Sequence, residues 1–122
     1  MTVVLDASAL LAFLQGEPGS STVEAALTGG AHCSTVNWSE VAQKVRAAGG
    51  DWGLVRALLD SYKLVVLDAT TADAEWAALH WQAGQGLSLA DRFCLALGER
   101  VEADVLTADT AWGTSGRVTQ IR

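Results

Sequence analysis

VVLDASALLAFL, residues 3–14, is the stretch that decides the fold of this chain. Its first three residues are apolar β-formers, which is typical of a strand buried on both faces of a parallel sheet. Apolar residues then continue at helical spacing from Leu10. Asp6 therefore stands at the carboxyl end of the strand, where open α/β sheets bind their ligands. Asp6 or Ser8 can alternatively act as a helix cap by accepting a backbone N–H.

The composition is that of a small globular protein, and we expect one domain over residues 1–122. Half of the residues are apolar and 18% are charged, which excludes intrinsic disorder and allows one hydrophobic core. The apolar runs are shorter than the roughly 18 residues of a membrane span, and the start lacks a secretory signal pattern. Cys33 and Cys94 lie in apolar patterns typical of buried thiols, so we expect a cytoplasmic protein without membrane contacts.

The charge balance is acidic, with 14 Asp and Glu against 8 Lys and Arg and a net charge of −6 at pH 7. Phosphate binding normally requires a basic surface, so this balance argues against a general nucleic-acid coat. A bound cation can reverse the balance locally, because the ion is often the largest charge in its site. Any RNA contact otherwise needs a local cluster of the few basic residues.

Strand and helix patterns alternate through the rest of the chain. We expect strands over residues 31–36, 64–68, 104–109 and 117–121. Between them we expect helices, one beginning at Pro18 and another opened by Asn37. This alternation predicts an α/β fold, a three-layer α/β/α sandwich with a mainly parallel central sheet.

Four acidic residues share one kind of position, at the carboxyl end of a strand or in the first turn of a helix. They are Asp6, Glu40, Asp91 and Asp109. Parallel strands end on the same side of a sheet, so we expect these acids to gather there. Two unit charges about 4 Å apart repel by about 4 kcal/mol at an effective dielectric near 20, unless a cation lies between them. Carboxylates without Cys or His companions favour Mg²⁺ or Mn²⁺ over zinc.

Each of these acids also has an alternative interpretation as part of a helix cap. Asn37 with Glu40, and Ser88 with Asp91, have the spacing of a capping box. Asp91 lies in a first turn, where the helix dipole favours a negative charge. Asp68 also follows a strand, and we assign it to the turn that comes after.

The motifs together resemble the PIN domain, and specifically the VapC-type ribonuclease toxins of bacterial or archaeal toxin–antitoxin pairs. The resemblance rests on VLDAS at residues 4–8, SEV at 39–41, LSLAD at 87–91, and LTAD at 106–109 with Trp112 after it. These motifs are short, but their order and spacing cover nearly the whole chain.

The resemblance implies an endoribonuclease in which the four acids hold one or two Mg²⁺ ions, with Mn²⁺ as the alternative. Ser8 and Thr107 would orient ligands or waters beside them. Arg92 would reach a phosphate, against the alternative of a solvated or ion-paired side chain, and Trp112 would stack on a base. The resemblance also implies an RNA substrate, a cognate antitoxin protein and a homodimer.

Two further functions fit part of the pattern. A phosphoacceptor receiver domain is also a parallel α/β fold of this length, and Asp68 would be its phosphorylated residue. That family implies a lysine at the end of a late strand, where neither Lys44 nor Lys63 lies, and it leaves Glu40 and Asp91 unexplained. A PIN fold that binds a partner without cleaving RNA is the third interpretation.

Overall fold

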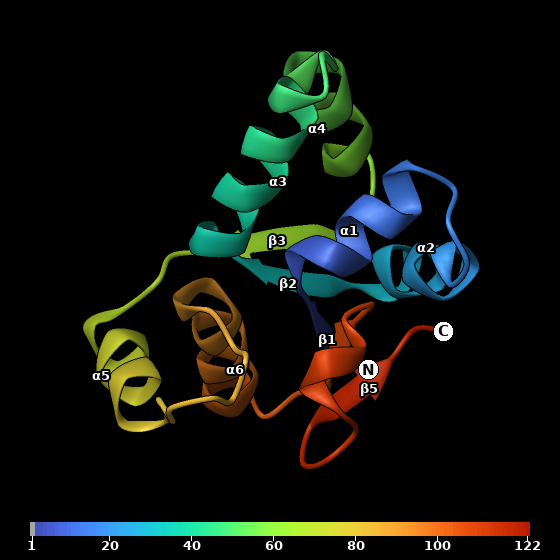
Figure 1. Ribbon diagram of the computed structural model, residues 1–122. Helices are drawn as coiled ribbons and strands as arrows, with labels where there is room; N and C mark the ends of the chain where they lie inside the picture. Colours follow the sequence, from blue (N-terminus) through green and yellow to red (C-terminus); the bar gives the residue numbers. More distant parts are fainter. Residues whose placement is uncertain (1) are drawn as a thin grey trace.

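The computed structural model describes residues 2–122 and shows a five-stranded parallel sheet flanked by helices (Figure 1). The elements in chain order are β1 Val3–Leu5, α1 Ala7–Leu14, α2 Ser20–Gly29, β2 Ala31–Ser34, α3 Thr35–Ala47, α4 Trp52–Asp60, β3 Leu64–Leu67, α5 Thr71–Leu79, α6 Leu89–Val101, β4 Val105–Thr107, the 3-10 turn η1 Thr110–Trp112, and β5 Val118–Gln120. The predicted α/β sandwich is confirmed, and the sheet is parallel throughout. No helix within residues 2–122 is long and apolar enough to cross a membrane.

The two faces of the sheet carry separate hydrophobic cores, because successive side chains of a strand point to opposite faces. Leu5 of β1 and Leu106 of β4 belong to the larger core, together with residues of α1 to α4. Their chain neighbours Val4 and Val105 belong to the second core, which they share with α6. The sheet is therefore the middle layer, with α1–α2 and α6 on opposite faces.

The strand order places β1 at the centre of the sheet and at the point where the chain reverses direction. The order is β3-β2-β1-β4-β5, so the chain first builds outward through β2 and β3 and later adds β4 and β5 on the other side. Leu5 pairs with Leu106, and the Asp6 N–H donates to the Leu106 carbonyl at 3.2 Å. Asp6 thus lies at the switch point between β1 and β4, where α/β sheets form their binding crevices.

Two predicted helix starts are wrong. The second helix begins at Ser20 instead of Pro18, because the chain turns at Gly19, whose φ is 92°. An added Cβ at Gly19 would lie 2.8 Å from the Ile121 side chain, so only glycine fits there.

The other error concerns Asn37, which does not open its helix. Helix α3 begins two residues earlier at Thr35, because the hydroxyl of Ser34 caps it and accepts the Val36 N–H at 3.2 Å. The second strand accordingly ends at Ser34 instead of residue 36. Because the helix starts two residues earlier than predicted, Asn37 is not its cap but a buried residue inside the first turn.

Candidate active site

Asp6 is almost fully enclosed, with 3% of its surface exposed. It caps α1, as one of its two interpretations predicted, and its Oδ1 accepts the Ala9 N–H at 2.8 Å. The Ser8 hydroxyl donates to both carboxylate oxygens, at 2.8 and 2.9 Å. The Thr107 hydroxyl donates to Oδ2 at 2.6 Å. The two hydroxyls chosen from the sequence therefore both contact the carboxylate of Asp6.

The backbone after β4 fixes these two hydroxyls in turn. The Ala108 N–H donates to Ser8 Oγ at 2.9 Å, and the Asp109 N–H donates to Thr107 Oγ1 at 3.0 Å. The two hydroxyl oxygens lie 3.2 Å apart. Since each hydroxyl accepts a backbone N–H, its single proton remains for Asp6. The Asp6 carboxylate is consequently held in one orientation by groups from both sides of the switch point.

Burial raises the pKa of Asp6 to about 6, and the negative charge of Asp91 contributes in the same direction. The hydrogen bonds from Thr107, Ala9 and Ser8 lower the pKa but do not compensate for the lost solvation. At neutral pH the ionised carboxylate therefore lowers the free energy of unfolding, because it has lost part of its solvation. A cation beside it would offset that loss.

Glu40 is positioned by Asn37, a residue whose role the sequence did not indicate. The Asn37 side chain is 1% exposed, and its Nδ2 donates to Glu40 Oε1 at 2.9 Å and to the Ala90 carbonyl at 3.2 Å. This amide therefore ties α3 to the first turn of α6, the turn that carries Asp91. The spacing of Asn37 and Glu40 predicts a capping box, whereas in the structure the Asn37 side chain bonds to Glu40 from inside the helix.

Asp91 lies at the N-terminus of α6 in the capping box that its sequence predicted. The Ser88 N–H donates to Asp91 Oδ2 at 2.9 Å, and the Asp91 N–H donates to Ser88 Oγ at 3.0 Å. Oδ1 of Asp91 has no hydrogen bond to residues 2–122. The residue therefore serves as a cap and still offers an oxygen to a ligand.

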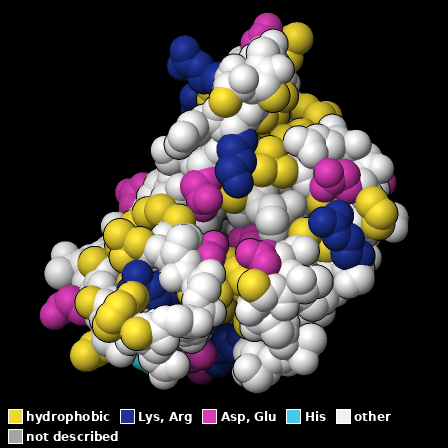
Figure 2. All heavy atoms as spheres, in the orientation of Figure 1, with side chains coloured by type: hydrophobic (Ala, Val, Ile, Leu, Met, Phe, Trp, Pro, Cys, Tyr) yellow, Lys and Arg dark blue, Asp and Glu magenta, His cyan; other side chains and the backbone are white. Residues whose placement is uncertain are grey.

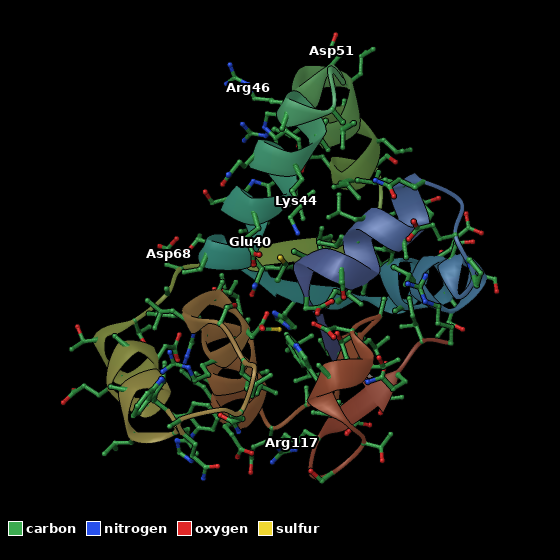
Figure 3. The ribbon with its side chains drawn as sticks, in the orientation of Figure 1. Glu40, Lys44, Arg46, Asp51, Asp68 and Arg117 are labelled. Carbon is green, nitrogen blue, oxygen red and sulfur yellow. The ribbon has the colours of Figure 1, made fainter. Side chains whose placement is uncertain are left out.

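Three of the four acids lie near two buried thiols. Burial raises the pKa of Cys33 to about 12, and the charges of Asp6 and Glu40 add to that effect. Burial also raises the pKa of Cys94 well above its usual value, with contributions from Asp6, Asp91 and Glu40. Both thiols are buried and protonated, as expected, so neither is a nucleophile. Figure 2 shows acidic side chains gathered at the centre of this face, and Figure 3 shows Glu40 reaching toward it from α3.

Asp109 lies apart from this trio. It follows β4, and its backbone N–H reaches Thr107, so it is linked to Asp6 through one hydroxyl. Its own side chain is exposed and accepts the Ala111 N–H at 2.9 Å, capping η1. The structure thus brings Asp6, Glu40 and Asp91 together and leaves the Asp109 carboxylate turned toward its own cap.

Two predicted RNA contacts are buried, which corrects that part of the prediction. The Arg92 guanidinium is 8% exposed and donates to the Ala77 carbonyl at 2.6 Å, so it joins α6 to α5. It is therefore neither a phosphate contact nor the solvated side chain that was the alternative. Trp112 is 7% exposed and packs in the second core with Val4 and Leu97, so it offers no face to a base.

The donor atoms at this edge suit a hard cation, although they are not arranged around one. Within residues 2–122, no three His, Cys, Asp or Glu side chains form a ready metal site. Each acid is held by its own cap or neighbour. All available donors are oxygens, as Mg²⁺ prefers. Among them is the buried Oδ1 of Asn37, which has no hydrogen-bond partner in the described chain.

The sequence and the fold both match known proteins. The family model described as PIN domain matches residues 3–114. No curated protein matches the chain.

Several solved structures share the fold over nearly the whole chain. A toxin–antitoxin complex from Klebsiella pneumoniae has a TM-score of 0.81 at 16% identity and covers 98% of both chains. The sarcin–ricin loop cleaving toxin VapC20 of Mycobacterium tuberculosis has a TM-score of 0.73 at 15% identity, over 93% of this chain and 95% of that one. VapBC2 from Rickettsia felis, bound to a fragment of its promoter DNA, has a TM-score of 0.71 at 12% identity, over 98% and 97%. At such identities the likeness shows the fold.

Proposed function

Because this chain belongs to the PIN domain family, we propose that it is a Mg²⁺-dependent endoribonuclease, the VapC-type toxin of a toxin–antitoxin pair. The observation that carries the proposal is the buried carboxylate of Asp6, whose pKa is raised by burial and by the charge of Asp91 and which forms no ion pair within residues 2–122. Every ion pair within residues 2–122 involves other acids. A divalent metal bound beside this carboxylate would compensate its charge.

The chain's own residues would hold this ion and the RNA in defined ways. When bound, Mg²⁺ polarises a phosphodiester and lowers the pKa of a bound water. Ser8 and Thr107 keep the Asp6 carboxylate in place from both sides of the switch point. Glu40 has one oxygen held by Asn37, which leaves its other oxygen to accept a proton from the attacking water. Asp91 offers its unbonded oxygen at the N-terminus of α6, and Asp109 would complete the ligand set after a side-chain rotation.

The most direct test is cleavage of total RNA by the purified protein, with the new RNA ends identified by sequencing. We expect cleavage with Mg²⁺ or Mn²⁺ and none in EDTA. Asp91→Asn should abolish it, because the amide removes a negative ligand from the site. Asp68→Asn is the matched control, since Asp68 follows β3, two strands away from β1. Full cleavage in EDTA, or by the Asp91 variant, would contradict the proposal.

The neighbouring structures support an antitoxin partner, because two of them are toxin–antitoxin complexes. We propose that a segment of the cognate antitoxin places an Arg or Lys beside Asp6 and Asp91, since arginine pairs bidentately with carboxylates. Its apolar residues would pack near Leu11, Leu14 and the 41–45 segment of α3. A homodimer is proposed on the family resemblance alone.

Co-purification with the product of the adjacent gene tests the partner. We expect the complex to be inactive, and replacing the inserted basic residue of the antitoxin should restore cleavage. If the neighbouring protein neither binds nor inhibits, the toxin assignment fails while a PIN nuclease still stands.

The topology argues against the receiver-domain alternative. Receiver domains of the flavodoxin-like type have the strand order 2-1-3-4-5, whereas this sheet has the order 3-2-1-4-5. Asp68 follows β3, two strands away from β1, and its backbone carbonyl accepts from Arg100 at 3.3 Å. Incubation with acetyl phosphate followed by intact-mass measurement should therefore show no phosphorylated protein.

A further inference from the structure

The eight basic side chains are the positive charges with which the protein can hold RNA phosphates, and most of them are already engaged. Four arginines form ion pairs with acids, namely Arg56 with Asp60, Arg100 with Asp73, Arg117 with Glu99, and Arg122 with Glu17. Arg92 is buried against a carbonyl. Within residues 2–122, the three that remain without an ion pair are Lys44, Arg46 and Lys63.

Lys63 lies on the wrong side of the sheet for contact with the acids. It immediately precedes β3, and its backbone bonds to Leu27 and Ala31, at the amino end of the strands. The acid trio lies at the carboxyl ends. Two basic residues of α3 are therefore left.

Lys44 and Arg46 point to different sides of α3. Lys44 is four residues after Glu40, which places it about 6 Å further along the helix and about 40° around it, on the same face. Arg46 is rotated by about 240° from Glu40. Figure 3 shows Lys44 extending from α3 toward the side where Glu40 lies, whereas Arg46 points away. Figure 2 shows a basic side chain beside the acidic centre of this face.

We propose that Lys44 binds a backbone phosphate of the RNA next to the acidic site, an inference that rests on the proposed ribonuclease function. The side chain is exposed and forms no ion pair with Glu40 in this structure, so its ammonium is available. An acidic centre repels phosphates on either side of the metal, and a flexible point charge one helical turn away offsets that repulsion. This contact would position the strand without reading its sequence.

A purely structural role for Lys44 is the competing interpretation, and Arg46 controls for it. Both residues lie in the last turn of α3, where a positive charge stabilises the helix dipole. Both are exposed, and neither is in an ion pair. Lys44→Gln and Arg46→Gln therefore each remove one positive charge from the same turn. Lys44→Gln removes it from the face of α3 that carries Glu40, and Arg46→Gln removes it from another face.

The experiment compares the two variants in RNA cleavage and in RNA binding. Cleavage is measured with Mg²⁺, and binding of a short single-stranded RNA is measured by fluorescence anisotropy in the Asp91→Asn background between 50 and 200 mM salt. We expect Lys44→Gln to weaken binding about tenfold and to reduce the slope of log K against log salt by about 0.7, the value of one phosphate contact on a single strand. KM should rise with little change in kcat. Arg46→Gln should stay within about twofold of its parent protein, and Lys44→Arg should restore binding.

The outcomes separate this inference from the function on which it rests. If the wild type cleaves RNA but Lys44→Gln behaves like Arg46→Gln, the role of Lys44 is refuted and the ribonuclease stands. An unchanged salt slope, or a loss of antitoxin binding with RNA binding intact, refutes it equally. If the wild type cleaves no RNA with any divalent metal, the proposed function fails first. Equal thermal midpoints of the two Gln variants confirm that both are folded.

Discussion

Asp6 and Asp73 are both buried aspartates at helix N-termini, each 3% exposed, yet their pKa values shift in opposite directions. Burial raises the pKa of Asp73 too, but the hydrogen bonds from Arg100 and Thr70, together with the charge of Arg100, outweigh it and leave the pKa below its usual value. Arg100 Nε and Nη2 lie 3.0 and 3.1 Å from the two carboxylate oxygens. The sequence can therefore supply a cation to a buried carboxylate, and at Asp6 it supplies none.

This difference separates a carboxylate that stabilises the fold from one that costs it free energy. The Asp73 and Arg100 pair ties α5 to α6, far from the switch point of the sheet. Asp6 lies at that switch point and carries its charge with hydroxyl and N–H partners alone. Strained or uncompensated groups tend to be retained where function requires them. The comparison leads to four predictions that treat the two aspartates as a matched pair.

Cleavage activity should show the largest contrast. Asp6→Asn should lower kcat/KM by about 10³-fold or more, because losing a metal ligand removes several kcal/mol of transition-state stabilisation. Asp73→Asn should retain most of the activity at a temperature where it is folded. RNA cleavage assays on both variants measure this. Equal losses in the two would mean that Asp6 acts through the fold alone.

The pH dependence of stability should come next. An acid whose pKa is higher in the folded state than in the unfolded chain binds its proton more tightly in the folded state. For Asp6, the stabilisation of the folded protein by this proton is fully present below pH 4 and is lost as the pH rises from about 4 to about 6. The loss is about 3 kcal/mol, at 1.36 kcal/mol for each pKa unit.

Urea unfolding of the metal-free protein between pH 4 and pH 7 tests this point. Asp6→Asn removes the titrating group, so the difference in unfolding free energy between wild type and variant should change by about 3 kcal/mol over this interval. The difference isolates Asp6 from other carboxylates, including Asp73, whose lowered pKa acts in the opposite direction. A difference that is independent of pH would show that the Asp6 charge carries no cost.

At neutral pH the order of the two variants should reverse: the Asp73 variant should lose more stability than the Asp6 variant. Asp73→Asn should destabilise the protein by about 2 kcal/mol, because it breaks a hydrogen-bonded pair with Arg100. The value is below that of a fully buried pair, since the Arg100 side chain is 36% exposed. Metal-free Asp6→Asn should be as stable as wild type or more so at pH 7.5. Thermal unfolding by circular dichroism measures both.

Stabilisation by Mg²⁺ should be the smallest effect and the most specific. With 10 mM Mg²⁺ and a dissociation constant near 1 mM, mass action stabilises the native state by about 1.4 kcal/mol. Asp6→Asn should abolish this gain, and Asp73→Asn should keep it, as differential scanning of each variant with and without Mg²⁺ would show. A gain that survives in Asp6→Asn would place the ion elsewhere.

Local patterns in the sequence determined the elements of this fold. Strand and helix periods predicted the α/β sandwich, and capping motifs placed Asp6 and Asp91 at helix N-termini, because such signals act within a few residues. Local signals misled where two of them competed. Asn37 and Glu40 have capping spacing, but Ser34 caps the helix first.

Tertiary structure alone decided which charged groups meet. Nothing local indicated that Asn37 bridges Glu40 to the start of α6, or that Arg92 and Trp112 are buried. The pairing of Asp73 with Arg100, 27 residues apart, and the unpaired charge of Asp6 also depend on how the helices pack on the sheet. Strand order and helix packing set these neighbours, and the free energy of a buried charge depends on its neighbours and its access to water, which no short stretch of sequence contains.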